Sequence, residues 1–327
     1  MHFTTRCLAA LVLLSGTAFA QQKGADPAKD YPNKPIRWLI DFGAGGLSDT
    51  LARIVGQKLT EAWNQPIINE ARPGVNGTIA NDIGAKAVPD GYTLVFVSTP
   101  FSINISVYDK LPFDTRRDFA PISLIAMYPN ILVAGPNFPA KTVSELIAYS
   151  KSKPGGPTWA TVGAGSSPYL ATELFLYMAD VKMNHIPYKG TGPALTDTIA
   201  GQIQLSWAST PGSVTFVKSG KLKALAVTSV KRIAPLPETA TVAESGLPGY
   251  EASVWYGVAA PARTPVEVVN RLNAEIVKVL ADRANHDKIA SADFEPTSSS
   301  PAEFAKFIRS EHAKWAKVVK ESGAKVD

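Results

Sequence analysis

The sequence predicts an α/β protein of two lobes, each a mainly parallel sheet flanked by helices. Short apolar runs alternate along the chain with amphipathic segments, a pattern typical of parallel strands joined by helices. The chain has 327 residues, and one such core rarely holds more than about 300 residues. Small residues directly follow several strand-like runs, as they do in the ligand loops of open α/β sheets.

The strand-like runs are rich in apolar residues and are bounded by turn residues. They are predicted at Ile36–Asp41, Pro66–Asn69, Tyr92–Val97, Ile131–Ala134, Thr158–Thr161, Ile203–Trp207, Ala224–Thr228 and Val254–Ala259. Residues 21–34 are polar and contain proline and glycine, so we expect a loose lead-in before the first strand.

Three helix starts carry a capping residue followed three positions later by glutamate, at Thr142, Thr264 and Ser300. Proline follows the last two, and proline is favoured in the first turn of a helix. The helix after Ser300 has apolar residues at three-and-four spacing, which predicts a packing face rather than a cofactor site. That face consists of Phe304, Phe307, Ile308, Trp315, Val318 and Val319.

The first twenty residues are predicted to be a secretory signal peptide. Arg6 gives a positive start, Leu8–Leu14 is an apolar core too short to span a bilayer, and Ala18–Ala20 is an A-x-A cleavage site. Cleavage after Ala20 removes Cys7, the only cysteine. We therefore expect an exported protein without disulfides, stabilised by its core.

The charge pattern argues against several function classes. The net charge is +5, and the basic residues are scattered rather than clustered, so nucleic-acid binding is not expected. The chain has no H-x-x-x-H pair and no dense carboxylate cluster, so we expect no metal and no cofactor.

The first strand leads into the most informative loop. A turn with Gly43, Gly45 and Gly46 lies between that strand and an amphipathic helix. Such a turn exposes backbone N–H groups at the positive end of a helix dipole, which binds anions without a charged side chain. Asp49 precedes Arg53 by four residues, so we expect Asp49 to pair with Arg53 or with the backbone and to shape the loop.

Small, glycine-bearing or hydroxyl-bearing turns recur at other strand-to-helix junctions. The five junctions are Gly43–Ser48, Val97–Ser102, Thr161–Pro168, Tyr188–Pro193 and Trp207–Gly212. Because ligands of open α/β sheets bind outside the carboxyl ends of strands, these turns predict two sets of loops facing a cleft.

Catalytic interpretations fit less well. The glycine turn lacks the third glycine of the dinucleotide fingerprint, and Gly163–Ser167 has its serine in the wrong place for G-x-S-x-G. His286 and His312 are expected on helix surfaces, which leaves His185 as a possible base. An exported serine hydrolase using Ser166 or Ser167 with His185 stays as the alternative.

The chain resembles the periplasmic solute-binding component of tripartite tricarboxylate transporters, the TctC/Bug family, over essentially all of its mature length. The residues that carry the resemblance are Tyr31-Pro32-x-Lys34-Pro35-Ile36-Arg37, Gly45-Gly46-x-x-Asp49-x-x-Ala52-Arg53, Gly74-x-Asn76-Gly77, Pro89-Asp90-Gly91-Tyr92-Thr93-Leu94, Asp118-Phe119-Ala120-Pro121, His185-x-Pro187-Tyr188-Lys189-Gly190, Gly220-Lys221-Leu222-x-Ala224-Leu225-Ala226-Val227-Thr228 and Trp255-x-Gly257.

The resemblance implies a type II-like periplasmic-binding-protein fold. Lobe 1 would comprise residues 35–124 plus 253–327 and lobe 2 residues 125–252, with the C-terminal helices packed on lobe 1. It also implies a periplasmic, monomeric, non-enzymatic protein that binds an organic carboxylate through backbone N–H groups and hydroxyls and delivers it to a membrane permease. A ligand-sensing adaptor without a transport role is a further alternative.

The resemblance and the junction turns together give the candidate ligand-binding residues. They are Phe42, Gly45, Gly46, Leu47, Ser48, Thr99, Phe101, Ser102, Gly165, Ser166, Ser167, Tyr188 and Thr210, with Lys189 in second rank beside Tyr188.

Two departures from the family pattern concern ligand choice. The first loop is commonly Pro-Phe-x-Pro-Gly-Gly-x-x-Asp, whereas this chain has Asp41-Phe42-Gly43-Ala44 followed by Gly45-Gly46-Leu47-Ser48-Asp49. Ser209-Thr210-Pro211 stands where an acidic residue is common. With Phe42, Phe101 and Trp207 near these loops, an aromatic or longer-chain dicarboxylic ligand is the hypothesis. The alternative is that these rings belong to the core.

Overall fold

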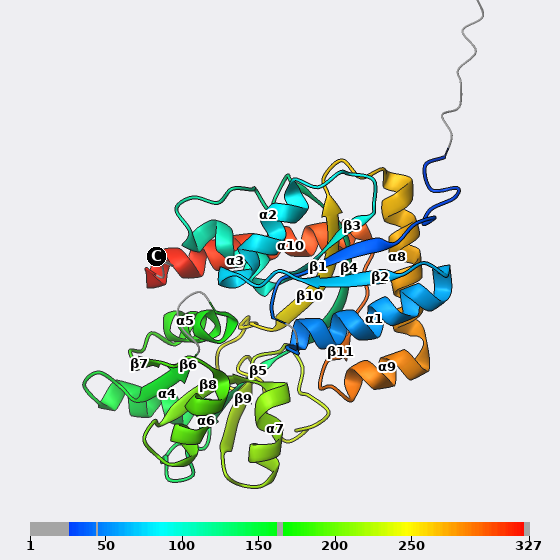
Figure 1. Ribbon diagram of the computed structural model, residues 1–327. Coiled ribbons are helices and arrows are strands. Elements are labelled where there is room, and N and C mark those ends of the chain that lie inside the picture. The colour runs from blue at the N-terminus through cyan, green and yellow to red at the C-terminus, as the bar shows by residue number, and fades with distance from the viewer. Residues whose placement is uncertain (1–25, 44, 162–165, 324–327) are drawn as a thin grey trace, which may run out of the picture.

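In the computed structural model, described for residues 26–43, 45–161 and 166–323, the chain forms two α/β lobes, each built on its own sheet (Figure 1). Within the described residues the first sheet has the strand order β11-β4-β10-β3-β1-β2, and the second has β7-β6-β8-β5-β9. The predicted signal peptide and Gly165 lie outside the described residues.

The first sheet consists of β1 (Ile36–Ile40), β2 (Ile67–Ala71), β3 (Thr93–Ser98), β4 (Phe119–Tyr128), β10 (Val254–Pro261) and β11 (Glu295–Pro296). Its helical elements are α1 (Leu47–Trp63), η1 (Val75–Gly77), α2 (Thr78–Ala85), α3 (Thr99–Val107), α8 (Val266–Ala281), α9 (Arg283–Ala290) and α10 (Pro301–Ser322). The second sheet consists of β5 (Asn130–Ala134), β6 (Thr158–Thr161), β7 (Asn184–Pro187), β8 (Leu205–Ser209) and β9 (Lys223–Val227). Its helices are α4 (Val143–Ser152), α5 (Ser167–Ala179), α6 (Thr191–Ile199) and α7 (Thr210–Lys218).

Both sheets are mixed, which differs from the expectation of mainly parallel sheets. The strands β2-β1-β3 and β7-β6-β8 pair in parallel, as expected for strands joined by helices. The strands β4, β10, β5 and β9 pair antiparallel to their neighbours. These include the strands next to the connections between the sheets, and Pro129 alone separates β4 from β5. Leu124, the expected last residue of lobe 1, therefore lies inside β4.

The local helix signals are confirmed at two of three positions. The Thr142 side chain caps α4, and Ser300 with Glu303 forms a full capping box at the start of α10. The prediction for Thr264 is wrong, because Pro265 occupies the N-cap position of α8 and shifts the helix start by one residue. The Thr264 hydroxyl is buried without a hydrogen-bond partner.

The lead-in is packed rather than loose in the part that the structure describes. Tyr31 is 3% exposed, and its ring packs against Trp63 and Tyr92. Its hydroxyl donates to the carbonyl of Gly91 at 2.6 Å. One buried aromatic residue therefore fixes the segment before β1, a long-range contact that its polar composition does not reveal.

The last helix spans both lobes. Phe304 and Ile308 pack with strands of the first sheet, as the predicted packing face requires. Trp315, Val318 and Val319 pack instead with α5 and the core of the second lobe. Figure 1 shows the C-terminal end of α10 beside α5. The final turns of α10 therefore pack on lobe 2, in addition to the packing on lobe 1 that the resemblance implies.

A partly buried ion cluster around Glu311 lies on this part of α10. The Lys314 ammonium lies 2.7 Å from a carboxylate oxygen of Glu251, in the segment that returns to the first sheet, and 2.6 Å from Glu311. Glu311 also accepts hydrogen bonds from the indoles of Trp255 and Trp315. Burial raises the pKa of Glu311, so Lys314 is the group that compensates its charge.

Candidate ligand-binding loops

The first glycine turn is held in shape by Asp49. This carboxylate accepts hydrogen bonds from the backbone N–H of Gly45 and from Arg53, each at 2.9 Å. Burial opposes its ionisation, but these donors hold the pKa of Asp49 below its usual value. The predicted structural role of Asp49 is confirmed. Gly45 has φ +80, a left-handed conformation that favours glycine.

The start of α1 is open to a ligand. Its N-cap is Gly46, which provides no side-chain cap, so the N–H groups of the first turn lack that partner. Gly45 and Gly46 are exposed, Leu47 is half-buried and Ser48 is buried. The Phe42 ring is 37% exposed beside this turn. The candidate groups here are therefore backbone N–H groups with an apolar neighbour.

In the β3–α3 loop, the side chains that were predicted to bind the ligand make contacts within the protein instead. Thr99 is fully buried, and its hydroxyl accepts from the backbone N–H of Trp255 at 2.9 Å. The Ser102 hydroxyl donates to the Thr99 carbonyl at 2.8 Å. The Phe101 ring is 1% exposed and packs edge-on against Phe119. These side chains stabilise the loop. The groups of this loop that remain as candidates for binding a ligand are the backbone N–H groups at the start of α3.

In the second lobe, two candidate residues lie where the chain passes between lobes. The Thr210 hydroxyl donates to the carbonyl of Pro129 at 2.9 Å. The Ser167 hydroxyl lies 3.4 Å from the side-chain amide nitrogen of Asn130. Asn130 is fully buried, and its amide oxygen has no hydrogen-bond partner. The sequence analysis missed Asn130, although an amide beside the apolar run of β5 was a usable signal.

Among the remaining candidates in lobe 2, Ser166 and Tyr188 bond within the protein, whereas Lys189 is exposed. Ser166 is the N-cap of α5 and accepts from the backbone N–H of Tyr169 at 3.3 Å. The Tyr188 hydroxyl donates to Asp197 at 2.6 Å, and Lys189 is exposed. Trp207 is 2% exposed in the lobe 2 core, so its ring, like that of Phe101, belongs to the interior.

The helix starts share one property that residue types alone do not reveal. At four junction loops the N-caps Gly46, Ser98, Gly190 and Ser209 make no side-chain cap. The fifth junction loop differs, because Ser166 caps α5 with its side chain. Outside these loops α4, α9 and α10 are each capped by a side chain, whereas α2 and α8 are not. Uncapped helix starts with free N–H groups are anion sites, so these four loops combine the expected chemistry.

Asp41 is the second residue that the sequence analysis missed. It follows β1 directly, is 2% exposed, and accepts a hydrogen bond from the Ser98 hydroxyl. It therefore ties the β1 loop to the β3 loop. Burial raises the pKa of Asp41 to about 7, although Ser98 and Ser48 oppose the shift.

The hydrogen bond and the ring contacts of His185 involve residues other than Ser166 and Ser167, the serines of the hydrolase alternative. The Nε2 atom of His185 lies 3.2 Å from the Thr161 hydroxyl, and its ring lies 4.3 Å from Trp159. Burial lowers the pKa of His185. His312, expected at the surface, is 9% exposed, with Nε2 3.0 Å from the Thr115 hydroxyl. Packing of α10 against the 108–118 segment buries it.

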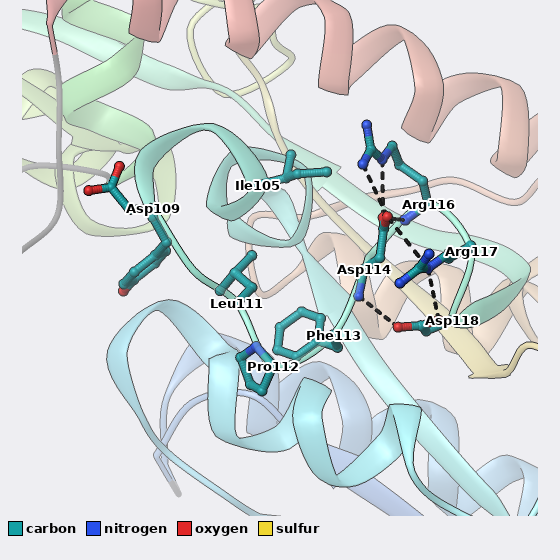
Figure 2. A pocket seen from close by; sticks show the side chains of 10 residues that line it. Ile105, Asp109, Leu111, Pro112, Phe113, Asp114, Arg116, Arg117 and Asp118 are labelled. Carbon is teal, nitrogen blue, oxygen red and sulfur yellow. Dashed lines mark hydrogen bonds and ion pairs between the residues drawn. The ribbon is translucent and has the colours of Figure 1, made fainter.

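A surface pocket of about 330 Å³ lies beside the end of α3 and not at the glycine turn (Figure 2). Its cations are neutralised locally. Arg116 binds Asp114 through two nitrogens at 3.1 and 3.0 Å, and Arg117 lies 3.7 Å from Asp114 and 3.6 Å from Asp118. Because these guanidinium groups are already paired, the uncapped helix starts offer the better anion chemistry.

Among residues 26–43, 45–161 and 166–323, no three His, Cys, Asp or Glu side chains gather in a way that would bind a metal ion. In the same residues, no helix combines the length and apolar character needed to cross a membrane.

Comparisons with known proteins give the same architecture. The family model TctC, "Tripartite tricarboxylate transporter family receptor", matches residues 51–324. Protein BugT of Bordetella pertussis is 34% identical over 325 residues, which cover 98% of this chain and 99% of the relative.

Solved structures of two similar proteins have the same fold over most of this chain. R. palustris Rpa4515 with adipate has a TM-score of 0.78 at 34% identity, covering 90% of this chain and 100% of that one. MatC from Rhodopseudomonas palustris with bound malate has a TM-score of 0.74 at 29% identity, covering 88% and 100%. The two-lobed α/β fold predicted from the sequence is thereby confirmed. The chain belongs to the TctC/Bug family of tripartite tricarboxylate transporter receptors, which are periplasmic solute-binding proteins.

Proposed function

We propose that this protein is exported to the periplasm, captures an organic carboxylate between its two lobes and delivers it to a tripartite tricarboxylate-type membrane permease. The observation that carries the proposal is the set of uncapped helix starts at the junction loops of both lobes. Adipate and malate are bound by the similar proteins named above, and both are dicarboxylates. The signal-like start of the sequence supports export.

The ligand groups that we propose are mainly backbone donors. On lobe 1 they are the N–H groups of Leu47 and Ser48, because the N–H of Gly45 donates to Asp49 and that of Gly46 donates to the carbonyl of Gly43. The start of α3 at Thr99 joins them. On lobe 2 the uncapped start is that of α7 at Thr210. It is joined by the loop that begins α5, whose start is capped by Ser166 and which contributes the Ser166 hydroxyl. Closure of the lobes about the β4–β5 and β10 connections would bring the two sets together, a known mode for periplasmic binding proteins.

The chemistry of the loops favours binding over catalysis. A hydrolase needs a serine activated by a histidine base. Here His185 is paired with Thr161, Ser166 caps α5, and Ser167 lies beside Asn130. These contacts support a protein that holds its ligand without converting it.

The structure narrows the hypothesis about ligand type. Phe101 and Trp207 are core residues, which leaves Phe42 and Leu47 as apolar groups at the first turn. We propose a dicarboxylate with an aliphatic or aromatic body that contacts Phe42. Calorimetry with adipate, phthalate and benzoate against citrate and aspartate tests this, and tighter binding of citrate or aspartate would contradict it.

A matched pair of variants at Leu47 tests the backbone-donor site. Leu47 is the first residue of α1, where proline is well tolerated, and Gly46 before it is extended, as a residue preceding proline requires. Leu47→Pro removes one N–H donor, whereas Leu47→Ala keeps it and removes the side chain. We expect Leu47→Pro to bind adipate at least tenfold more weakly than Leu47→Ala, because a hydrogen bond to a charged group contributes about 1.5–3 kcal/mol.

Equal affinities of the two variants, with both proteins folded by circular dichroism, would refute the backbone-donor site. Delivery to a permease has its own test. Deleting the partner permease should abolish uptake of the bound acid, whereas an adaptor that only reports the ligand would leave uptake intact and change induction instead.

A further inference from the structure

A buried acid lies beneath the loop that we propose as the anion site. Asp41 follows the carboxyl end of β1 and is 2% exposed. Its Oδ2 atom accepts from the Ser98 hydroxyl. The Ser48 side chain lies near enough to lower the pKa of the carboxyl. Its Oδ1 atom is buried and has no hydrogen-bond partner. Since Ser48 is the second residue of α1, one of the groups that acts on the Asp41 carboxyl belongs to the open helix start.

No cation compensates this carboxyl among the described residues that interact with it. On its own side are the hydroxyls of Ser98 and Ser48, and from β10 the side chain of Tyr256 faces it. The pKa of Tyr256 is raised well above its ordinary value by burial, so this group stays neutral. On α1, Arg53 is engaged by Asp49, whose own pKa is lowered.

Two anions would therefore compete for one helix start. An ionised Asp41 would be stabilised by the same helix dipole that stabilises a ligand carboxylate. A like charge nearby also disfavours ionisation of either group. Burial already raises the pKa of Asp41 to about 7. A bound carboxylate raises it further, because the two negative charges repel each other across a poorly solvated turn.

We propose that Asp41 must be protonated for the first glycine turn to hold a carboxylate, so that capture of the anion takes up one proton from solution. Asp41 is then a positioning and selectivity residue that couples ligand affinity to pH. The inference rests on the proposed function, because it needs a carboxylate at this turn.

The coupling has a defined pH profile. Below the pKa of Asp41 in the free protein the carboxyl is already protonated, so affinity is independent of pH. Above about pH 7, and up to the higher pKa of the complex, affinity falls by up to tenfold for each pH unit, because each binding event must first protonate Asp41. A ligand that offered a cation to Asp41 would give the opposite slope.

Isothermal titration of adipate and of malate into the full exported protein tests the proposal between about pH 6 and 9, where both carboxyl groups of each acid are ionised. Repeating each titration in buffers of different ionisation enthalpy counts the protons taken up. We expect uptake approaching one proton per ligand near pH 8 for the wild type. Asp41→Asn, which keeps the shape without the charge, should bind with a flat profile and no uptake.

Two further variants separate Asp41 from other groups. Asp90→Asn removes a carboxylate that pairs with Lys34 on the surface of lobe 1, so it should keep the wild-type profile. Ser98→Ala removes a donor that stabilises ionised Asp41, so it should shift the profile to higher pH. The Ser98 variant keeps the proposal testable if Asp41→Asn does not fold.

The outcomes distinguish this inference from the proposed function. Binding of adipate or malate without proton uptake, or with a profile that Asp41→Asn leaves unchanged, would refute the role of Asp41 and leave carboxylate binding intact. A profile that disappears in His185→Ala and persists in Asp41→Asn would assign the coupling to lobe 2 and also refute it. Absence of binding at every pH would refute the proposed function and this inference with it.

Discussion

The buried carboxyl of Asp41 should make the stability of the ligand-free protein depend on pH. Its pKa is about 7 in the folded state against the ordinary 3.8. The folded state therefore binds more protons than the unfolded state between these values, and the free energy of unfolding falls as pH rises through that window. This contribution is fully present below about pH 4 and is lost as pH rises through about 7.

The magnitude follows from the two pKa values. One pKa unit corresponds to about 1.4 kcal/mol, and the full shift to about 4 kcal/mol. Between pH 5 and pH 8 the linkage relation gives a loss of about 2.5 kcal/mol from this group alone. Asp41→Asn cannot ionise, so it should lack this loss while keeping all other pH effects.

Denaturant unfolding of the wild type and Asp41→Asn at pH 5 and pH 8 measures the difference directly. The wild type should lose about 2.5 kcal/mol more than the variant over this range. Equal losses in the two proteins, within about 0.5 kcal/mol, would mean that Asp41 is not buried as an uncompensated acid. That result would refute the reasoning for both its stability effect and its proton coupling.

Three further predictions follow from individual contacts. Gly45→Ala places a side chain at φ +80 and should cost about 1–2 kcal/mol and weaken adipate binding, whereas Gly43→Ala, with open space around it, should do neither, as calorimetry would report. Lys314→Met leaves buried Glu311 and half-buried Glu251 without their cation and should lose about 3–5 kcal/mol in denaturant unfolding, mostly at neutral and higher pH, while exposed Lys320→Met stays within about 0.5 kcal/mol. His185→Ala should keep adipate binding, and neither the wild type nor the variant should turn over ester or amide substrates. Hydrolysis by the wild type that is lost in His185→Ala would instead favour the hydrolase.

Features set by neighbouring residues could be predicted from the sequence. The capping box at Ser300 and the pairing of Asp49 with Arg53 each depend on residues at most four positions apart. The strands β1 and β3 and the glycine turn after β1 were likewise recognisable, because apolar runs and turn residues specify them locally.

Features set by long-range packing could not. The burial of Phe101, His312 and Trp207 depends on which elements cover them, and no local pattern encodes that. The division of α10 between lobes is of the same kind, because one continuous apolar face packs on two partners. Asp41 was missed because an acid at the end of a strand appears solvent-exposed until its neighbours are known.

A crystal structure of the protein with adipate tests the central claim most directly. We predict a ligand between the two lobes, with one carboxylate accepting hydrogen bonds of about 2.7–3.0 Å from the N–H groups at the start of α1. We also predict contacts from the loops that begin α5 or α7. Adipate bound in the pocket beside Arg116 and Arg117, or bound without any contact to residues 45–48, would contradict that claim.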